Sequence, residues 1–556
     1  MRRNEPRSVA RALAATLALP LVAGGQGSSR DETALHAPTP ATVAVWTDRL
    51  GYTTWLHTVR AYLAMDPMDD RGEYFRTVYL EHVASGERRY WQRPERQPGP
   101  TGGPPGPWLV TGRIPAMEPV RLRWSGRVAE PGLWRFVVEL RSADRTELVK
   151  RAAAGFVVSF ELPLEVGQEG SGTEILADTV WGRDRIRVVR GPVFVREGST
   201  LTLEAGALVL ARGARAAIVV ERGARIVAEG RPDAPVVLSC EAPVGKREPG
   251  CWGGLAVLGR SPAERRDSAA AGVEPEARGA FGGDEAADSS GVLRYVRVEF
   301  AGGGAYGAGI GLHGVGAGTR IDHVQSHASG SDGIRLAGGT VSCRHCVASG
   351  SRGHGLSWDD GWQGAVQHLY VQQDDTAEGC GIDANRAGSG GVRGPGGGPR
   401  LFNLTLVGPG GDARGCQVGM RFRGKAAGTV SNLAVTGFGT GFGFEDERAR
   451  RAFGAAGGSV SHAIFEGAGA GVRHLDKDPA LVNVRWGPGP DPRPRWGAAA
   501  LQVGAAAVPP SDGWLDTSAE YIGAFGPWNW LEGWTFFGPE SAYASPGTHP
   551  PENGIE

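Results

Sequence analysis

The feature that most constrains this chain is a paired motif that recurs seven times between residues 291 and 475. Its first half is a short alternating strand with a polar or aromatic residue at its centre, as in "VQHLYVQ" and "VSNLAVT". Its second half follows 9 to 16 residues later and reads Gly-apolar-x-residue, as in "GIRL" and "GMRF". The central residues of the first half lie 22 to 35 positions apart and are Tyr295, His323, His345, His368, Asn403, Asn432 and His462.

A repeat of this length, with two or three short strands and no helical segment, predicts a solenoid of parallel strands. One repeat cannot bury its own apolar side, but coils stacked about 4.8 Å apart pair every backbone group with the coils above and below. Gly contributes 89 of the 556 residues without a Gly-X-Y period, which indicates many tight turns rather than collagen. Leucine-rich and propeller repeats fit less well because their Leu/Asn and Trp-Asp patterns are missing.

Several longer segments carry a family resemblance, among them "VERGARIVAEGRPDAPVVLSC", "CWGGLAVLG", "SSGVLRYVRVEFAGGG" and the C-terminal "YIGAFGPWNWLEGWTFFGP". From about Gly191 onward the chain resembles a right-handed parallel β-helix of the pectate-lyase-like superfold. More narrowly, it is similar to a largely uncharacterised group of exported bacterial β-helix proteins. The resemblance implies a β-helix over residues 191–510, a Trp-rich C-terminal cap over 511–545 and a tail over 546–556.

The region before the β-helix alternates apolar and polar residues with period two, as in "YFRTVYLEHV" and "LWRFVVELRS". Strands that follow one another without helical periodicity predict an antiparallel β-sandwich, placed here at residues 43–160. This stretch resembles immunoglobulin-like or macroglobulin-like domains. A linker over 161–190 would join it to the β-helix, so the predicted fold class is all-β, a right-handed parallel β-helix preceded by an antiparallel β-sandwich.

The N-terminus reads as an export signal over residues 1–25, with a basic "MRRNEPR", an apolar "ALAATLALPLVA" and small residues for cleavage. A linker over 26–42 would follow. The alternative is a frayed N-terminal helix of a cytosolic protein. The signal predicts an exported protein, secreted, periplasmic or at the cell surface, with no membrane span once the signal is removed. A formal charge of −1 gives no indication of nucleic-acid binding.

Six Cys fit an oxidising compartment. Cys240 and Cys251 flank a short loop that a disulfide would close, and Cys380 and Cys416 fall at nearly the same place in adjacent coils. Cys343 and Cys346 form a C-x-x-C, whose pairing stays open between buried thiols, a local bridge and a zinc or redox site.

The central His and Asn residues of the repeat would stack in one column. A metal ladder is one interpretation. The other is a structural ladder of polar side chains that hydrogen-bond along the stack, which the free mixing of His with Asn favours because Asn is a poor transition-metal ligand. We assign no metal to this column.

The second half of the motif predicts an outward-facing strip, since alternate residues of a strand point to opposite faces. The predicted ligand-binding residues of this strip are Arg335, Asp359, Asp383, Arg421 and Arg423, with Trp358 nearby, which would either stack on a sugar ring or pack in the core. The candidate catalytic residues are Asp332, His354, Asp359 and Asp383, although neither the lyase nor the hydrolase motif of this superfold is intact. The resemblance implies that carboxylates of such a strip hold Ca²⁺, which makes Ca²⁺ the one cofactor considered.

Two functions from different classes follow. The leading hypothesis is a non-enzymatic exported or cell-surface protein whose extended face binds a polymer, such as a polysaccharide, or a surface protein. The alternative is a carbohydrate-active enzyme, a polysaccharide lyase or glycoside hydrolase, acting on an acidic polysaccharide. A structural spacer would differ from the first only in lacking a specific ligand.

Overall fold

The computed structural model describes residues 164–537, apart from gaps at 169–171, 184, 233, 243–246, 265–267, 275, 387–397, 411–414, 468, 485–489, 503 and 532–533. Before residue 164 it describes the backbone of nine separate strands. The predicted signal peptide and first linker lie almost wholly outside the described residues, and the tail 546–556 lies wholly outside them.

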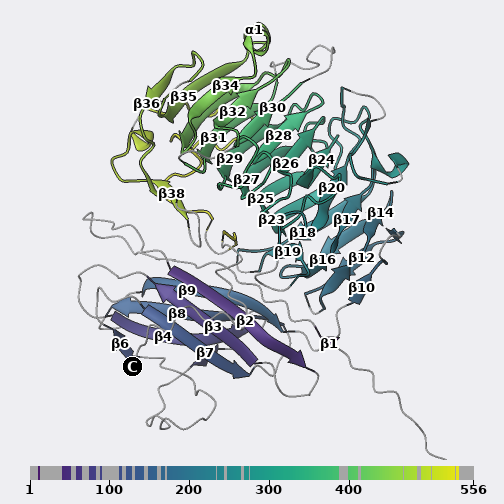
Figure 1. Ribbon diagram of the computed structural model, residues 1–556, viewed down its shortest axis with the longest axis vertical. Helices are drawn as coiled ribbons and strands as arrows, with labels where there is room; N and C mark the ends of the chain where they lie inside the picture. The colour runs from purple at the N-terminus through teal and green to yellow at the C-terminus, as the bar shows by residue number, and fades with distance from the viewer. Residues whose placement is uncertain are drawn as a thin grey trace, which may run out of the picture.

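From Leu164 onward the chain coils through parallel strands, whose colours change steadily along the stack in Figure 1. The strands of one long sheet, here the outer-strip sheet, are β11 (Thr173–Ile175), β14 (Pro192–Val195), β17 (Gly213–Val220), β20 (Trp252–Leu258), β24 (Ala308–His313), β26 (Asp332–Ala337), β28 (Leu356–Asp359), β30 (Ile382–Ala384), β32 (Val418–Phe422) and β34 (Thr440–Phe444).

The second long sheet, here the kinked sheet, is also built from parallel pairs. Its strands are β10 (Leu164–Val166), β12 (Thr179–Trp181), β13 (Arg187–Val189), β15 (Thr200–Leu203), β16 (Leu208–Ala211), β18 (Arg225–Glu229), β19 (Val236–Cys240), β23 (Gly291–Glu299), β25 (Arg320–His327), β27 (Ser342–Ser349), β29 (Ala365–Gln372), β31 (Arg400–Val407), β33 (Thr429–Thr436), β35 (Ser459–Phe465) and β36 (His474–Asp476). These two sheets confirm an all-β chain with a parallel β-helix. The right hand of its coil stays a prediction, which the general preference for right-handed crossovers favours.

The kinked sheet shows how two strands merge into one. In the early coils β18 and β19 are separate, yet both pair with β23, β18 with its first half and β19 with its second. The join is Tyr295, whose φ of 49° bends the strand. Parallel pairing thus begins at Leu164, inside the predicted linker 161–190, because the first strands are too short to show a periodicity.

Every central residue of the repeat has a left-handed backbone, with φ between 48° and 60°. His and Asn are among the residues that adopt this conformation most readily, which explains why they fill the column. The kink also resets the alternation of side chains. Ile321 and Val324, three positions apart, therefore both point into the core instead of to opposite faces.

The core is one apolar cluster that runs the length of the stack. In the outer-strip sheet it takes the residues on either side of each outward one, such as Ile334 and Leu336 around Arg335, both at most 2% exposed. Because each coil contributes Ile, Leu, Val or an aromatic residue at these places, burial continues from one coil to the next.

Three disulfides are present among the described residues: Cys240–Cys251, Cys343–Cys346 and Cys380–Cys416, with Cα–Cα distances of 5.9, 6.4 and 4.8 Å. The two predicted pairs are confirmed. The third forms because Cys343 and Cys346 replace the inward pair Ile321 and Val324 of the preceding coil.

One helix was not expected in the repeat region. α1 (Glu447–Ala455) follows β34, and its N-cap Asp446 accepts a hydrogen bond from the Ala449 N–H at 2.7 Å. Its charged and alanine-rich sequence favours a helix once that cap satisfies the first turn. The minor elements of the stack are β21 (Ser268–Ala269), η1 (Glu276–Gly279), β22 (Ala280–Phe281), β37 (Leu481–Asn483), β38 (Asp491–Pro494) and η2 (Ala499–Leu501).

After η2 the chain turns back along the kinked sheet, a path we name the return segment (residues 505–537). Asn432 exchanges two hydrogen bonds with Ala507, at 2.9 and 2.8 Å. Farther along the return segment, the Phe536 N–H donates to the side chain of Gln325 at 2.8 Å. Gln325 lies several coils before Asn432. The return segment therefore runs against the direction of the stack. The limits of the predicted cap, 511–545, stay a prediction.

The N-terminal strands pair antiparallel, as expected for residues 43–160. One sheet holds β1 (Arg11–Ala12), β2 (Ala41–Gly51), β3 (Thr58–Met65) and β7 (Val120–Arg127), and the other holds β4 (Tyr74–His82), β5 (Arg88–Tyr90), β6 (Gly112–Ile114), β8 (Gly132–Ser142) and β9 (Leu148–Val158). The packing of these two sheets as a sandwich stays a prediction.

Candidate functional site

The outward column of the outer-strip sheet is continuous through four coils. Arg335 of β26 pairs in register with Ser357 of β28, which pairs with Asp383 of β30 and then Arg421 of β32. Their neighbours in sequence point inward, so these four side chains share the outer surface. Arg335, Asp383 and Arg421 thus lie in one outward column, as the strand alternation predicts. Arg473 lies outside this column, before β36 of the kinked sheet.

Asp383 is the centre of the strip. Its Oδ1 accepts from the Arg421 Nε at 2.7 Å, and its Oδ2 accepts from the Arg423 Nη1 at 3.3 Å. These guanidiniums cover the carboxylate, leaving Asp383 only 4% exposed while the Arg421 and Arg423 side chains stay 28% and 36% exposed. A ligand reaching this point meets the arginines before the acid.

Arg423 also bonds a second carboxylate, because its Nε donates to Glu445 at 3.1 Å. Burial alone would lower the pKa of Arg423, but its hydrogen bonds to Glu445 and Asp383 outweigh it and raise that pKa above the ordinary value. The guanidinium is therefore fully charged at any working pH.

His354 lies beside Asp383 with a fixed tautomer. The Cys380 N–H donates to the His354 Nδ1 at 2.9 Å, so the neutral imidazole carries its proton on Nε2. That Nε2 is 3.7 Å from the Asp383 Oδ2. The His354 imidazole, the Cys380 Sγ and the Asp383 carboxylate thus approach one another, but Cys380 is disulfide-bonded to Cys416 and offers no thiolate to a metal.

The other candidate acids are held apart from this pair. Asp332 accepts from the His354 backbone N–H at 2.9 Å and from the Ser357 hydroxyl at 2.6 Å. Asp359 accepts from the Arg335 Nη2 at 2.5 Å. Asp332, Asp359 and Asp383 do not gather into one group of metal-ligating atoms among the described residues. These three carboxylates therefore do not act together as ligands of one Ca²⁺ ion, which takes six to eight oxygens.

Trp358 packs inward. Its side chain is 3% exposed, with Trp362 5.7 Å and Phe422 5.6 Å away between ring centroids. A ring in the core is not available to stack on a sugar, so our proposal for the strip leaves Trp358 out.

A cavity of about 320 Å³ lies elsewhere, near η1 and the ends of β14 and β17. Its charged lining is internally paired: Arg196 and Arg278 both bond Glu221, at 3.1 and 3.3 Å, and Arg260 bonds Glu197. Burial raises the pKa of Glu221 above its ordinary value, against the pull of Arg196 and Arg278. These pairs stabilise the loop around η1 and leave the cavity with no excess of either charge.

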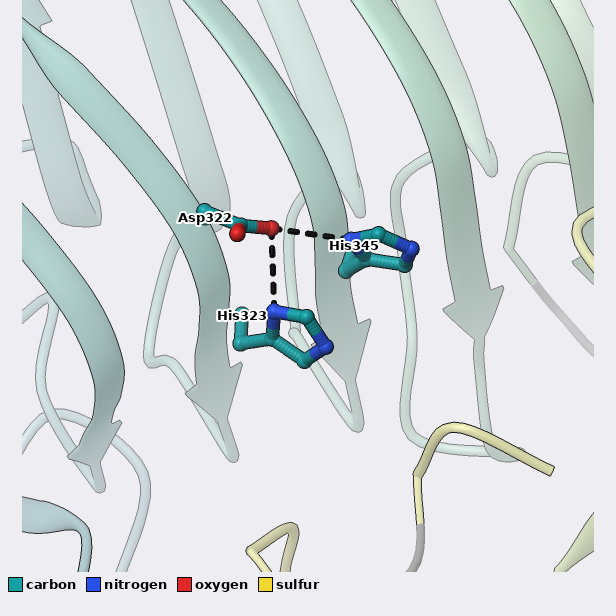
Figure 2. Close-up of side chains that lie close together, drawn as sticks. All are labelled: Asp322, His323 and His345. Carbon is teal, nitrogen blue, oxygen red and sulfur yellow. Dashed lines mark hydrogen bonds and ion pairs between the residues drawn. The ribbon is translucent and has the colours of Figure 1, made fainter. Parts of the chain in front are cut away.

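One cluster escaped the sequence reasoning. Asp322 lies beside His323 and His345 on the kinked sheet, and its carboxylate reaches both imidazoles (Figure 2). Only the His residues stood out in the sequence. The signal that was missed is the acid directly before a left-handed residue, because the kink turns neighbouring side chains to the same side.

In the part of the chain that the structure describes, no helix has both the length and the apolar character needed to cross a bilayer.

Among solved structures, this chain is similar to the catalytic unit of the thermostable GH87 alpha-1,3-glucanase from Streptomyces thermodiastaticus strain HF3-3. The identity is 11%, over 84% of this chain and 99% of that one, with a TM-score of 0.21. It is also similar to a Northeast Structural Genomics Consortium target, at 13% identity over 22% of this chain and 88% of that one, with a TM-score of 0.14. Neither likeness carries an argument at these TM-scores.

No curated protein matches the chain. A family model does: residues 173–477, more than half of the sequence, match the pectate-lyase like beta helix domain. The match covers the coils from β11 to β36, including the whole outer strip. The chain therefore belongs to the family of pectate-lyase-like β-helix proteins.

Proposed function

We propose that this protein is an exported β-helix protein that binds an anionic polysaccharide along the outer strip, without cleaving it. The observation that carries the proposal is the set of half-exposed guanidiniums at the two ends of the strip, Arg335 on β26 and Arg421 with Arg423 on β32. The family match supports a carbohydrate ligand.

The spacing of these arginines favours an extended ligand. Arg335 and Arg421 share one column and are three coil steps apart. At about 4.8 Å per step the separation is about 14 Å, along a line parallel to the stack. A polymer laid along that line meets charges at both ends, whereas a compact metabolite reaches only one end.

The arginines retain donors for such a ligand. A guanidinium has five N–H donors, and the hydrogen bonds described here use one on Arg335, one on Arg421 and two on Arg423. The acids bonded to them hold each fork in place, so less side-chain entropy is lost when a carboxylate of the ligand binds.

Export is supported by the oxidised cysteines. Six cysteines form three disulfides, and stable disulfides belong to oxidising compartments. Together with the predicted signal peptide they favour a secreted, periplasmic or surface location.

One observation favours the enzymatic alternative. His354 has a defined tautomer and points its Nε2 toward Asp383, an arrangement that other proteins use for proton transfer. Against it, Asp383 is covered by two arginines, and among the described residues no second carboxylate shares its position, while glycoside hydrolysis uses two accessible carboxyl groups.

The experiment is a polysaccharide panel with the full-length protein. Polygalacturonate and alginate are compared with a neutral glucan, with and without Ca²⁺, and both binding and product formation are measured. We expect binding of acidic polymers that needs no Ca²⁺ and weakens with salt, without unsaturated products or new reducing ends. Products would establish the enzyme, and absence of all binding would leave a structural spacer.

A further inference from the structure

On the kinked sheet, away from the outer strip, three ligand-type side chains converge on one point (Figure 2). The Asp322 Oδ1 lies 2.9 Å from the His323 Nδ1 and 2.8 Å from the His345 Nδ1. Asp322 and His323 come from β25 and His345 from β27, so the cluster joins adjacent coils.

The left-handed backbone creates this convergence. Adjacent residues of a regular strand point to opposite faces, yet Asp322 and His323 meet on one side because φ of His323 is 55°. His345 has the same conformation, with φ of 48°, one coil later. The position of the three side chains is thus fixed by the repeat itself and not by a flexible loop.

The imidazoles are also held by their neighbours. His323 stacks on His345 with ring centroids 4.2 Å apart, and His345 stacks on His368 at 4.7 Å. Trp530 of the return segment meets His345 edge-on at 5.2 Å, and Trp534 meets His323 at 5.6 Å. The stack holds the His323 and His345 rings nearly parallel, so one ring must turn before both in-plane Nδ1 lone pairs can point at a single ion.

The carboxylate of Asp322 is held in its charged form. Burial would raise the pKa of Asp322, but the hydrogen bonds from His323 and His345 outweigh burial and hold that pKa well below its usual range.

Two cations flank Asp322 in register, Arg294 on β23 and Arg344 on β27. Both guanidiniums lie over aromatic rings, Arg294 over Tyr295 at 5.4 Å and Arg344 over Trp514 at 4.7 Å. Each guanidinium is therefore held over an aromatic ring, and the charge of Arg294 still acts on His323.

We propose that Asp322, His323 and His345 bind one divalent transition-metal ion of the zinc type. Two imidazole nitrogens and one carboxylate oxygen are a ligand set that Zn²⁺ takes, with its remaining position open to water, whereas Ca²⁺ prefers oxygen alone. An imidazole that bonds the ion through Nδ1 carries its proton on Nε2, so the protons that now face Asp322 move to the other ring nitrogen. Ligand atoms about 2.0–2.1 Å from a tetrahedral ion are roughly 3.3 Å apart, so the cluster opens by about half an ångström.

The ion would tie two adjacent coils together beside the return segment. The strip that we propose for polysaccharide lies on the other sheet. Failure of either proposal therefore leaves the other standing.

The test uses untagged full-length protein, stripped of metal and titrated with Co²⁺ and Zn²⁺. Binding is followed by the visible absorption of Co²⁺ and by calorimetry. The main variant is H323N/H345N, because Asn403 and Asn432 occupy the same left-handed position in later coils and show that Asn is accepted there. H462N is the matched control, since exposed His462 belongs to the same column.

The wild type should bind one ion per chain, with the intense visible bands of four-coordinate Co²⁺, and H462N should match it within twofold. H323N/H345N should lose binding, and D322N, which leaves the stacked rings in place, should weaken it at least tenfold. No binding by the wild type, or unchanged affinity in a folded H323N/H345N or D322N, would overturn the proposal. D322N alone decides the matter if the double variant does not fold.

Discussion

At the scale of single residues, the left-handed column explains both the shape and the chemistry of the kinked sheet. Seven residues with φ between 48° and 60° bend each strand at the same place. Where the column carries His, the rings stack on one another, and where it carries Asn, the side chains bond the return segment. The column is thus held by ring stacking and by bonds to the return segment, where the structural ladder predicted hydrogen bonds along the stack.

Asn403 provides a test of this role. It is fully buried and donates to the carbonyls of Ala519 and Tyr521, at 3.1 and 2.7 Å. N403A leaves these carbonyls without a donor and puts a Cβ-bearing residue with no local hydrogen bond in the left-handed region. We expect a loss of about 3 kcal/mol or more in the free energy of unfolding. N403G should recover about 1 kcal/mol of it, since Gly adopts this backbone freely. Equal stability of N403A and wild type in denaturant titrations would refute the role.

Buried histidines make stability depend on pH. Burial is the main cause that lowers the pKa of His368 from 6.5 to about 3. Burial lowers the pKa of His313 to about 3 as well. Because the native pKa is below the unfolded one, this contribution is complete above pH 6.5 and is lost as the pH falls toward 3. Within that window, each such histidine lowers the free energy of unfolding by up to about 1.4 kcal/mol for every unit by which the pH falls.

The prediction is measured between pH 6.5 and 5, above the range of ordinary carboxylates. H368N should flatten the pH dependence of the unfolding free energy by about 1 kcal/mol per pH unit, because one buried imidazole no longer takes a proton on unfolding. The exposed control H462N should keep the wild-type slope. An H368N slope equal to that of the wild type would show that His368 is protonated in the native state as readily as in the unfolded one.

At the scale of elements, the coils are predictable and the additions to them are not. Alternation of apolar residues reveals the strands, and the spacing of Cys380 and Cys416 reveals that they lie in adjacent coils. α1 depends on the N-cap at Asp446, and the repeat pattern of the strands gives no indication of this cap. The Cys343–Cys346 bond needs the kink at His345, which turns both sulfurs inward and which spacing alone does not show.

Each disulfide should stabilise the fold more, the longer the loop that it closes, although only with the logarithm of the loop length. Cys380–Cys416 spans 36 positions and Cys240–Cys251 spans 11. Chain-entropy estimates give about 4 and 3 kcal/mol for these loops. We expect C380A/C416A to lose about 1 kcal/mol more unfolding free energy than C240A/C251A. Mass mapping of the unreduced exported protein provides the direct check on the pairing. Free thiols at these four positions would contradict both the pairing and the predicted export.

At the scale of the whole molecule, the return segment joins coils that are far apart in the sequence. Phe536 bonds Gln325, 211 positions earlier, and Tyr521 bonds Asn403. No local sequence pattern predicts contacts between residues so far apart in the chain. The path of the return segment could therefore not be predicted, nor could the surroundings of His323 and His345. The outer strip could be predicted from the sequence, because its column follows directly from the alternation of side chains along each strand. The hydrogen bonds that cover Asp383 could not be predicted in this way.

Removal of residues 505–556 should expose the apolar and polar groups that the return segment covers, including buried Tyr370 and Asn403. The truncated protein should melt at a lower temperature and bind a hydrophobic dye, since the kinked sheet would present uncovered apolar surface. A chain that lacks only the predicted tail 546–556 serves as control and should melt like the wild type. Identical melting of both truncations would mean that the return segment adds nothing to stability.

The central claim is that the arginines of the outer strip bind an anionic polymer, and the most direct measurement is the affinity of R421A/R423A for polygalacturonate. R473A, which removes an exposed arginine outside the strip, is the matched control. R421K/R423K keeps the charge over Asp383 and tests the fork geometry if the alanine variant is destabilised. We predict at least a tenfold loss of affinity and a smaller salt dependence in folded R421A/R423A, with R473A equal to the wild type. Unchanged affinity and salt dependence in R421A/R423A would contradict the claim and place polymer binding elsewhere on the molecule.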